Sequence, residues 1–339
     1  IFLKINMKND LKYLTLVFSI LLADNEVCFE IEPNPIQNQP GFAYFTKYVN
    51  VLDCFEVFAP SNISDAKVLH VAAVAAELLD NNEDGVVDDP LIEQELADME
   101  ALMPIFTSEN SQAANSFFNN YNGDGVSAVL FNNEIDPSNP GHWGDDATVE
   151  EVIHTINHVG HVSVYPETFE IYPNSSIMSD AMDIARGGQF LNIPNQYPEE
   201  AWYHYDDWTC DYECMAIEYL YWCIVSYMGI LDDPQTCNGI DNEWELCTPE
   251  LFESTDVIMH GILSDLSFLL PQNAPDGNYC PNSILLGDLN SDGIINILDI
   301  IMTVNIILGT SSFNEAGDMN ADGFIDVLDI VSLVNLILS

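Results

Sequence analysis

An internal repeat near the C-terminus constrains the fold more than any other feature of this sequence. The segment GDLNSDGIINILDIIMTVNIILG, which starts at Gly287, recurs as GDMNADGFIDVLDIVSLVNLILS from Gly317. Each copy is an acidic loop of the pattern D-x-N-x-D-G that runs into an amphipathic helical pattern. The sequence therefore predicts a small all-α module over residues 285–339, made of two loop–helix units in tandem.

The repeated loops carry oxygen-bearing side chains at the spacing of a calcium-binding loop. Positions 1, 3, 5, 9 and 12 are acidic or amide residues in both copies, and position 6, where such a loop turns sharply, is glycine. The main-chain carbonyl of position 7 adds a further ligand. The candidate calcium ligands are Asp288, Asn290, Asp292, Ile294, Asn296 and Asp299 in the first copy, and Asp318, Asn320, Asp322, Phe324, Asp326 and Asp329 in the second. We expect one Ca²⁺ in each loop.

Residues 285–339 resemble a type I dockerin in the two loops, the aspartate at position 12 and the tandem helices. The resemblance implies a calcium-binding module that docks onto a cohesin module of a scaffold protein, often in proteins that degrade polysaccharides. Dockerins of cellulosomes carry small polar recognition residues at loop positions 10 and 11. Here these positions hold Ile297, Leu298, Val327 and Leu328. The alternatives to a cohesin-like partner are therefore another protein partner, or packing of the module on its own chain.

The charge of the chain excludes two classes of partner. The sequence contains 55 Asp and Glu against 6 Lys and Arg, which gives a formal net charge of −49. Such a surface repels the phosphates of nucleic acids and anionic membranes, so we expect neither as a partner. It suits calcium binding, and it equally suits an acidic surface that keeps a protein soluble in saline water.

The first residues indicate an exported protein. With Met7 as the start, MKNDLK forms a basic segment and YLTLVFSILLA a short apolar segment, with cleavage expected after Ala23. No later segment is long and apolar enough to span a membrane. We therefore expect residues 1–23 to be upstream residues plus a signal peptide, and the mature protein to be secreted.

Eight cysteines in an exported chain are typical of disulfide bonds. They are Cys28, Cys54, Cys210, Cys214, Cys223, Cys237, Cys247 and Cys280. Proximity in sequence favours the pairs Cys28–Cys54 and Cys237–Cys247. Cys210 and Cys214 are expected to form disulfide bonds, with metal binding as the alternative.

Residues 24–276 contain no internal linker and are expected to form one domain, followed by a linker over residues 277–284. Helical periodicity is clear in four segments, whereas strand patterns are sparse. The helical segments are residues 65–80, 90–103, 148–161 and 210–229. We therefore predict a mainly α protein, in which an α-rich domain (α or α+β) precedes the all-α C-terminal module.

A third acidic loop, residues 80–91, follows the first of these helices. Its positions 1, 3, 5 and 9 hold Asp80, Asn82, Asp84 and Asp88. Position 12 is Leu91, so the closing carboxylate would have to come from Asp89 or Glu93. We expect a third Ca²⁺ here; the alternative is an acidic turn that caps a helix.

The segment TVEEVIHTINHVGH, residues 148–161, places three histidines on one face of a predicted helix. Thr148 and Glu151 form a T-x-x-E capping box, which predicts the start of the helix. With helical periodicity, the valines and isoleucines gather on one side. The opposite side contains Glu151, His154, His158 and His161. The histidines are therefore expected to face solvent or a cleft.

The spacing of His154 and His158 lets two imidazoles bind one zinc ion from a single helix face. This short helix resembles the active-site helix of zincin metallopeptidases. The gluzincin branch of that family implies a third ligand from a glutamate on a later helix. Glu218 fits this position, with Glu213 and His161 as alternates.

One residue departs from the zincin pattern. Zincins use the glutamate that follows the first histidine as the general base, and here that position is Thr155. Glu150 or Glu151 would have to supply the base. The leading hypothesis is a zincin-like zinc site, which would be a hydrolase of peptide bonds only if Glu150 or Glu151 replaces the missing base. A metal site without hydrolysis and a polar helix face without metal are the alternatives.

Other features support different functions. The segment PEEAWYHYDDWTCDYE, residues 198–213, sets aromatic residues beside carboxylates, which suits either a sugar cleft or a packed aromatic corner. A polysaccharide-active enzyme or carbohydrate-binding protein is therefore an alternative, as is a non-enzymatic, calcium-stabilised surface or matrix protein. Arg186, the only arginine, is expected to pair with a buried carboxylate or to bind a carboxylate of the substrate.

Overall fold

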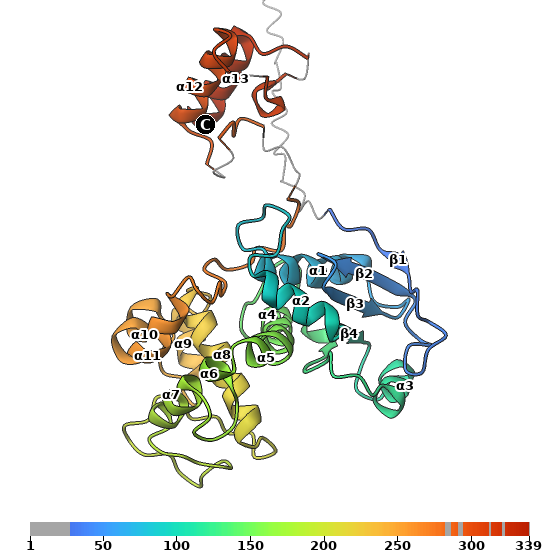
Figure 1. Ribbon diagram of the computed structural model, residues 1–339, viewed down its shortest axis with the longest axis vertical. Helices are drawn as coiled ribbons and strands as arrows, with labels where there is room; N and C mark the ends of the chain where they lie inside the picture. Colours follow the sequence, from blue (N-terminus) through green and yellow to red (C-terminus); the bar gives the residue numbers. More distant parts are fainter. Residues whose placement is uncertain (1–27, 282–285, 291–293, 312, 321–322, 339) are drawn as a thin grey trace, which may run out of the picture.

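The computed structural model describes residues 28–281, 286–290, 294–311, 313–320 and 323–338 of the chain (Figure 1). The expected signal segment, residues 1–23, lies outside these residues, as do the candidate calcium ligands Asp292 and Asp322. Residues 28–281 form a domain of helices and strands, and a helical module follows it in the chain. In the described part of the chain, none of the helices has the length and apolar character needed to cross a membrane.

The N-terminal domain is built on a five-stranded sheet in the order β1-β2-β3-β4-β5. The strands are β1 (Glu32–Pro33), β2 (Lys47–Val51), β3 (Phe55–Ala59), β4 (Leu102–Phe106) and β5 (Leu130–Phe131). The pairs β1–β2 and β2–β3 are antiparallel, with Val49 opposite Val57, whereas β3–β4 and β4–β5 are parallel. All five residues of β4 are buried, as is typical of a parallel strand with both faces covered.

The prediction of a mainly α protein is therefore wrong, because the N-terminal domain is mixed α/β. Each strand spans five residues or fewer, which leaves little room for an alternating pattern. The buried strand β4, with the sequence LMPIF, is a continuous apolar run that periodicity cannot distinguish from a helical core segment.

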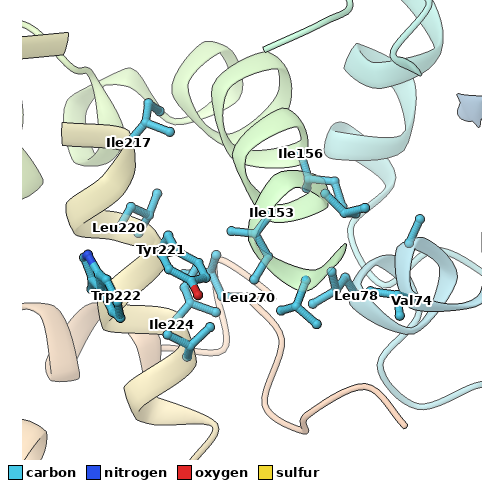
Figure 2. Packing of buried hydrophobic residues seen from close by; sticks show 14 of the residues in the cluster. Val74, Leu78, Ile153, Ile156, Ile217, Leu220, Tyr221, Trp222, Ile224 and Leu270 are labelled. Carbon is cyan, nitrogen blue, oxygen red and sulfur yellow. The ribbon is translucent and has the colours of Figure 1, made fainter. Parts of the chain in front are cut away.

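Three helices position the candidate site. Helix α1 (Asp65–Leu79) begins after Ser64, whose hydroxyl caps it, and packs on β2 and β3. Helix α4 (Thr148–Thr155) packs against α1, and helix α8 (Tyr212–Tyr227) packs against α4. Figure 2 shows apolar side chains from all three helices meeting in the core. They include Val74 and Leu78 from α1, Ile153 from α4, and Leu220 and Ile224 from α8.

The remaining helical segments of this domain complete the fold around the sheet and these three helices. They are α2 (Pro90–Asp98), α3 (Gln112–Asn120), η1 (Asn132–Glu134), η2 (Ile156–His161), α5 (Val162–Val164), α6 (Pro166–Phe169), α7 (Ile177–Ala185), α9 (Pro234–Ile240), α10 (Pro249–Thr255) and α11 (Val257–Leu263). A second core, of aromatic residues, contains Phe42, Phe45, Phe58, Phe106 and Phe117 and includes α3.

Three disulfides join described cysteines: Cys28–Cys280, Cys210–Cys214 and Cys237–Cys247. The expected pair Cys237–Cys247 is confirmed, and Cys210 bonds with Cys214 rather than holding a metal. The expected pair Cys28–Cys54 is wrong. Cys54 is a buried thiol beside the β2–β3 hairpin, whereas the main chain of Cys28 runs beside Tyr279 and donates a hydrogen bond to its carbonyl.

Residues 277–281, which the sequence assigns to a linker, are attached to the N-terminal domain. The main-chain N–H groups of Gly277 and Asn278 donate to the carboxylate of Glu77 on α1. The hydroxyl of Tyr279 donates to Asp80 at 2.5 Å. This segment therefore packs on the acidic loop that follows α1.

The C-terminal module consists of helices α12 (Ile297–Ile307) and α13 (Val327–Leu338), which pack against each other, and the 3₁₀ turn η3 (Glu315–Gly317). Helix α12 begins with a capping box formed by Asn296 and Asp299. The small core of the C-terminal module contains Leu289, Ala316 and Leu333. The predicted all-α module is thus helical in its described residues.

Candidate metal centre and calcium loops

The histidine segment does not form one regular helix. Helix α4 ends at Thr155 and continues as the π-helix η2, Ile156–His161. The expected capping box is also wrong: the N-cap is Ala147, and the Thr148 hydroxyl donates instead to Asp146 at 2.7 Å. A π turn is wider than an α turn, so it changes which side chains share a face.

A cavity of about 350 Å³ lies between this segment and α8. It brings together four of the predicted site residues from two distant parts of the sequence. They are Glu151, His154, His158 and Glu218, and the alternate ligand Glu213 also lines the cavity. The rest of the wall is formed by Ser127, Ala128, Ile171, Ile217 and the disulfide-bonded Cys214.

His154 lies between two carboxylates. Its Nε2 is 3.3 Å from Glu218 Oε2, and its Nδ1 is 3.5 Å from Glu151 Oε2. Burial disfavours the charged ring, but Glu218 and Glu151 outweigh this effect and hold the pKa of His154 well above its ordinary value. His154 is only 6% exposed, and its Nε2 has no hydrogen-bond partner, so the approach of Glu218 is not a well-aligned hydrogen bond.

Further groups support this arrangement. The hydroxyl of Tyr205 donates to Glu218 Oε1 at 3.2 Å, which fixes the orientation of that carboxylate. Glu150, Glu151 and His154 offer potential ligand atoms that all lie within 4.8 Å of one another. Burial raises the pKa of Glu150 to about 8. Glu150 does not line the cavity, whereas Glu151 does.

His158 is exposed, and its Nδ1 lies 2.9 Å from the hydroxyl of Ser127. This contact leaves Nε2 as the ring nitrogen for another ligand. Neither His158 nor Glu218 is part of the group of ligand atoms within 4.8 Å, which Glu150, Glu151 and His154 form among the described residues. The predicted ligands His154, His158 and Glu218 nevertheless line the same cavity.

His161 lies apart from the other histidines, which corrects the expectation of a shared polar face. It is 4% exposed, packs edge-on against Phe169 and lines a different, small cavity with Leu78 and Asp89. The physical reason is the π turn, because the three-residue step from His158 to His161 no longer returns to the same face.

Arg186 neither lines the cavity nor pairs with a described carboxylate. It is fully buried, donates through one NH group to the Phe190 carbonyl at 2.8 Å, and lies over the rings of Phe190 and Tyr197. The expected buried ion pair is therefore wrong in the described part of the chain. Aromatic rings and a carbonyl surround the guanidinium instead.

Two site residues were not singled out from the sequence. Tyr205 lies in the aromatic segment 198–213, where the pattern gave no reason to choose it over its neighbours. Ser127 lies in a loop far from the histidine helix in sequence. Most of that aromatic segment is structural: Tyr203 is fully buried and donates to the Met215 carbonyl.

The described residues of the C-terminal loops fit a bound cation. The carboxylates of Asp288, Asp299, Asp318 and Asp329 are all buried, and residues 286–338 contain no Lys, Arg or His. Within the described residues, Asp329 Oδ1 is buried without a hydrogen-bond donor. Burial of carboxylates is costly, and a bound cation would offset that cost. Carboxylate, amide and main-chain oxygens are the ligands that calcium prefers.

The loop that follows α1 repeats a detail of the second C-terminal loop. In both loops the glycine at position 6 donates its N–H to Oδ2 of the aspartate at position 1, over 2.7 Å: Gly85 to Asp80, and Gly323 to Asp318. Both glycines have positive φ, 90° and 85°. The expected closing residue Asp89 is used elsewhere, because it caps α2 and accepts from Tyr165.

Comparison with known families identifies the C-terminal module. The family model for the Dockerin type I domain matches residues 286–338. Comparison of the chain with curated proteins and with solved structures gave no match. The C-terminal module is a calcium-binding module, and more particularly a type I dockerin domain. The zincin resemblance of the histidine helix has no support from these comparisons.

Proposed function

We propose that this protein is an extracellular, metal-dependent hydrolase that its dockerin domain attaches to a cohesin-like partner. The catalytic centre is the cavity around His154. The observation that carries the proposal is the buried approach of His154 Nε2 to Glu218 Oε2, 3.3 Å apart and without an aligned hydrogen bond.

The 3.3 Å distance fits a shared cation, and it equally fits the ion pair by which Glu218 raises the pKa of His154. A tetrahedral zinc site with bonds of about 2.0–2.1 Å holds its ligand atoms about 3.3–3.4 Å apart. A hydrogen bond would account for the same distance only if the N–H pointed at the oxygen, and it does not. The donor set of imidazole and carboxylate is the one that zinc takes in hydrolases.

In this proposal each residue around the cavity has a separate role. His154 and Glu218 would hold the ion, and His158 would supply a further nitrogen. Tyr205 orients Glu218, and Glu151 contacts the far nitrogen of His154, as outer carboxylates do in metal sites. Bound zinc would lower the pKa of a water molecule in the cavity.

Glu151 is the base in this proposal, because it lines the cavity and Glu150 does not. Thr155 is fully buried and does not line the cavity either. In peptide hydrolysis Glu151 takes a proton from water, and the hydroxyl adds to the carbonyl carbon. The C–N bond breaks, and the amine nitrogen receives the proton from Glu151.

Metal content of the full secreted chain tests this function. We expect elemental mass spectrometry to find about one zinc per wild-type chain and to find it lost in His154→Ala and Glu218→Gln. Glu253→Gln, at an exposed position on α10, is the matched control and should retain the zinc. Calcium should be the same in all four proteins. Calcium alone in the wild type would overturn the proposal.

The partner of the dockerin domain is also part of the proposal. Type I dockerin domains bind cohesin partners. The apolar residues at loop positions 10 and 11 are exposed, with Ile297 at 63% and Val327 at 64%. Their exposure supports a partner protein that covers an apolar surface rather than packing on the described part of this chain.

A carbohydrate-binding role is the second candidate. A larger cavity of about 450 Å³ lies beside the β2–β3 hairpin, and its wall includes Tyr48, Tyr121, Asn50, Asp53 and Glu56. Aromatic rings beside amides and carboxylates suit a sugar. Binding of the wild type to a polysaccharide panel, compared with Tyr121→Ala, tests this role; no binding to any member would reject it.

A further inference from the structure

The lining of the cavity around His154 contains more than the candidate metal ligands and Glu151. It also includes the aliphatic side chains of Ile171 and Ile217 and the carboxylate of Glu213. Glu213 and Ile217 are four residues apart on α8, so they lie on the same face of that helix. No Lys or Arg lines the cavity. Ile171, Ile217 and Glu213 are not needed for the metal centre, so their chemistry bears on what else the cavity binds.

Glu213 has no cationic partner in the described structure. It lies in the first turn of α8, and its side chain is exposed. None of the hydrogen bonds or ion pairs of the described residues uses its carboxylate. The charged groups that act on it are Asp211 and Glu170, both acidic. Glu213 therefore presents a negative charge to the cavity in surroundings that are already negative.

The carboxylate of Glu213 carries a negative charge that the proposed cation does not offset. In the proposed centre, a divalent cation is offset by Glu218 and Glu151, which leaves the inner part of the cavity close to neutral. Glu213 adds one more negative charge beyond that balance. A favourable occupant would bring a positive charge to this end of the cavity.

We propose, on the basis of the metal-dependent hydrolase proposed above, that the cavity selects peptides through a lysine or arginine side chain. The aliphatic stem of that side chain packs on Ile171 and Ile217, and its charged end pairs with Glu213. Lysine and arginine combine an apolar stem with a charged tip, as this wall requires.

Acidity alone would not carry this inference, since the whole chain is acidic. The dipole of α8 also stabilises an acidic residue in its first turn, whatever the cavity binds. The distinguishing feature is the position of Glu213 next to an aliphatic wall in the cavity that holds His154. If Glu213 only stabilises α8, its replacement should leave the peptide selectivity unchanged. Peptide selectivity of the wild type and of a Glu213 variant therefore separates the two roles.

The experiment uses the full secreted chain with four fluorescently labelled peptides that differ only at a central residue: Lys, Arg, norleucine or Glu. Fluorescence anisotropy gives the affinity of each peptide for the zinc-free and zinc-loaded protein, and cleavage gives kcat/KM. The variants are Glu213→Gln and, as a matched exposed control, Glu253→Gln. We expect the wild type to bind the Lys and Arg peptides about tenfold more tightly than the norleucine peptide.

In Glu213→Gln this preference should disappear, while the norleucine peptide binds as before and Glu253→Gln behaves as the wild type. Equal affinity of the wild type for all four peptides, or a preference that survives in Glu213→Gln, would overturn the inference. The hydrolase proposal fails separately, if no zinc binds and no peptide is cleaved. In the zinc-free protein no cation offsets Glu151 and Glu218, so the affinity for the Lys and Arg peptides that is lost in Glu213→Gln, rather than the preference itself, then decides whether Glu213 binds basic side chains.

Discussion

At the scale of single residues, His161 gives the domain a defined pH dependence. Burial lowers its pKa from 6.5 to about 4. The unfolded chain takes up a proton on this residue near pH 6.5, whereas the folded domain does so only near pH 4. The contribution of His161 to stability is therefore complete above pH 6.5 and is lost as the pH falls from 6.5 to 4.

We expect the free energy of unfolding of the wild type to fall by about 2 kcal/mol more than that of His161→Leu between pH 7 and pH 5. Urea unfolding in calcium-containing buffer at both pH values measures this difference. Carboxylates titrate in both proteins, so the comparison isolates His161. If the two proteins lose the same stability, His161 is not a buried neutral histidine.

At the same scale, the sequence singled out side chains that line one cavity, although their role as metal ligands stays a prediction. His154, His158 and Glu218 all line this cavity. Arg186 was not predictable, because its environment depends on the loop that carries Phe190 and Tyr197. A sequence shows that a lone arginine needs compensation, but not whether a carboxylate or aromatic rings provide it.

At the scale of elements, the sequence predicted those helices that have a regular hydrophobic periodicity. Helix α1 and helix α8 correspond to predicted helical segments, since each has many residues and clear boundaries. The π turn of η2 carries no residue pattern that distinguishes it from an α-helix, and it moved His161 to another cavity. The parallel pairing of β3, β4 and β5 depends on contacts between segments that are distant in sequence.

The number of Ca²⁺ ions bound per chain tests the predicted calcium loops. We expect calorimetric titration of metal-free protein to find two Ca²⁺ in the dockerin domain and a third at the loop that contains Asp80. Asp329→Ala should remove one Ca²⁺, because Asp329 closes the second loop and has a buried oxygen without a donor among the described residues. Asp80→Ala should remove another.

The helices of the dockerin domain should respond to the loss of calcium. Chelation should lower the circular dichroism signal of the helices, since the buried carboxylates would then repel one another. Glu253→Gln, at an exposed position on α10 outside the predicted calcium loops, is the control for both measurements. An unchanged stoichiometry in Asp80→Ala would show that the loop after α1 is an acidic turn without calcium.

At the scale of the whole molecule, covalent closure joins the two ends of the N-terminal domain. The disulfide Cys28–Cys280 links residues 252 positions apart. Close to it, Tyr279 bonds to Asp80, and Gly277 and Asn278 bond to Glu77. The end of the domain is thus held on the acidic loop, and the dockerin domain follows it in the chain. Local spacing of cysteines could not predict a bond over this separation.

The two disulfides Cys28–Cys280 and Cys237–Cys247 allow a test of this closure. In the chain-entropy model, a bond stabilises the fold by restricting the unfolded chain, by about 5.5 kcal/mol for a separation of 252 and about 2.7 kcal/mol for a separation of 10. We therefore expect Cys28→Ser/Cys280→Ser to lose about 3 kcal/mol more than Cys237→Ser/Cys247→Ser in urea unfolding. The two double variants are matched, because each removes two cysteine sulfur atoms and one disulfide bond. An equal or smaller loss for the long-range pair would mean that the contacts of Glu77 and Asp80 already hold this end of the domain without the covalent bond.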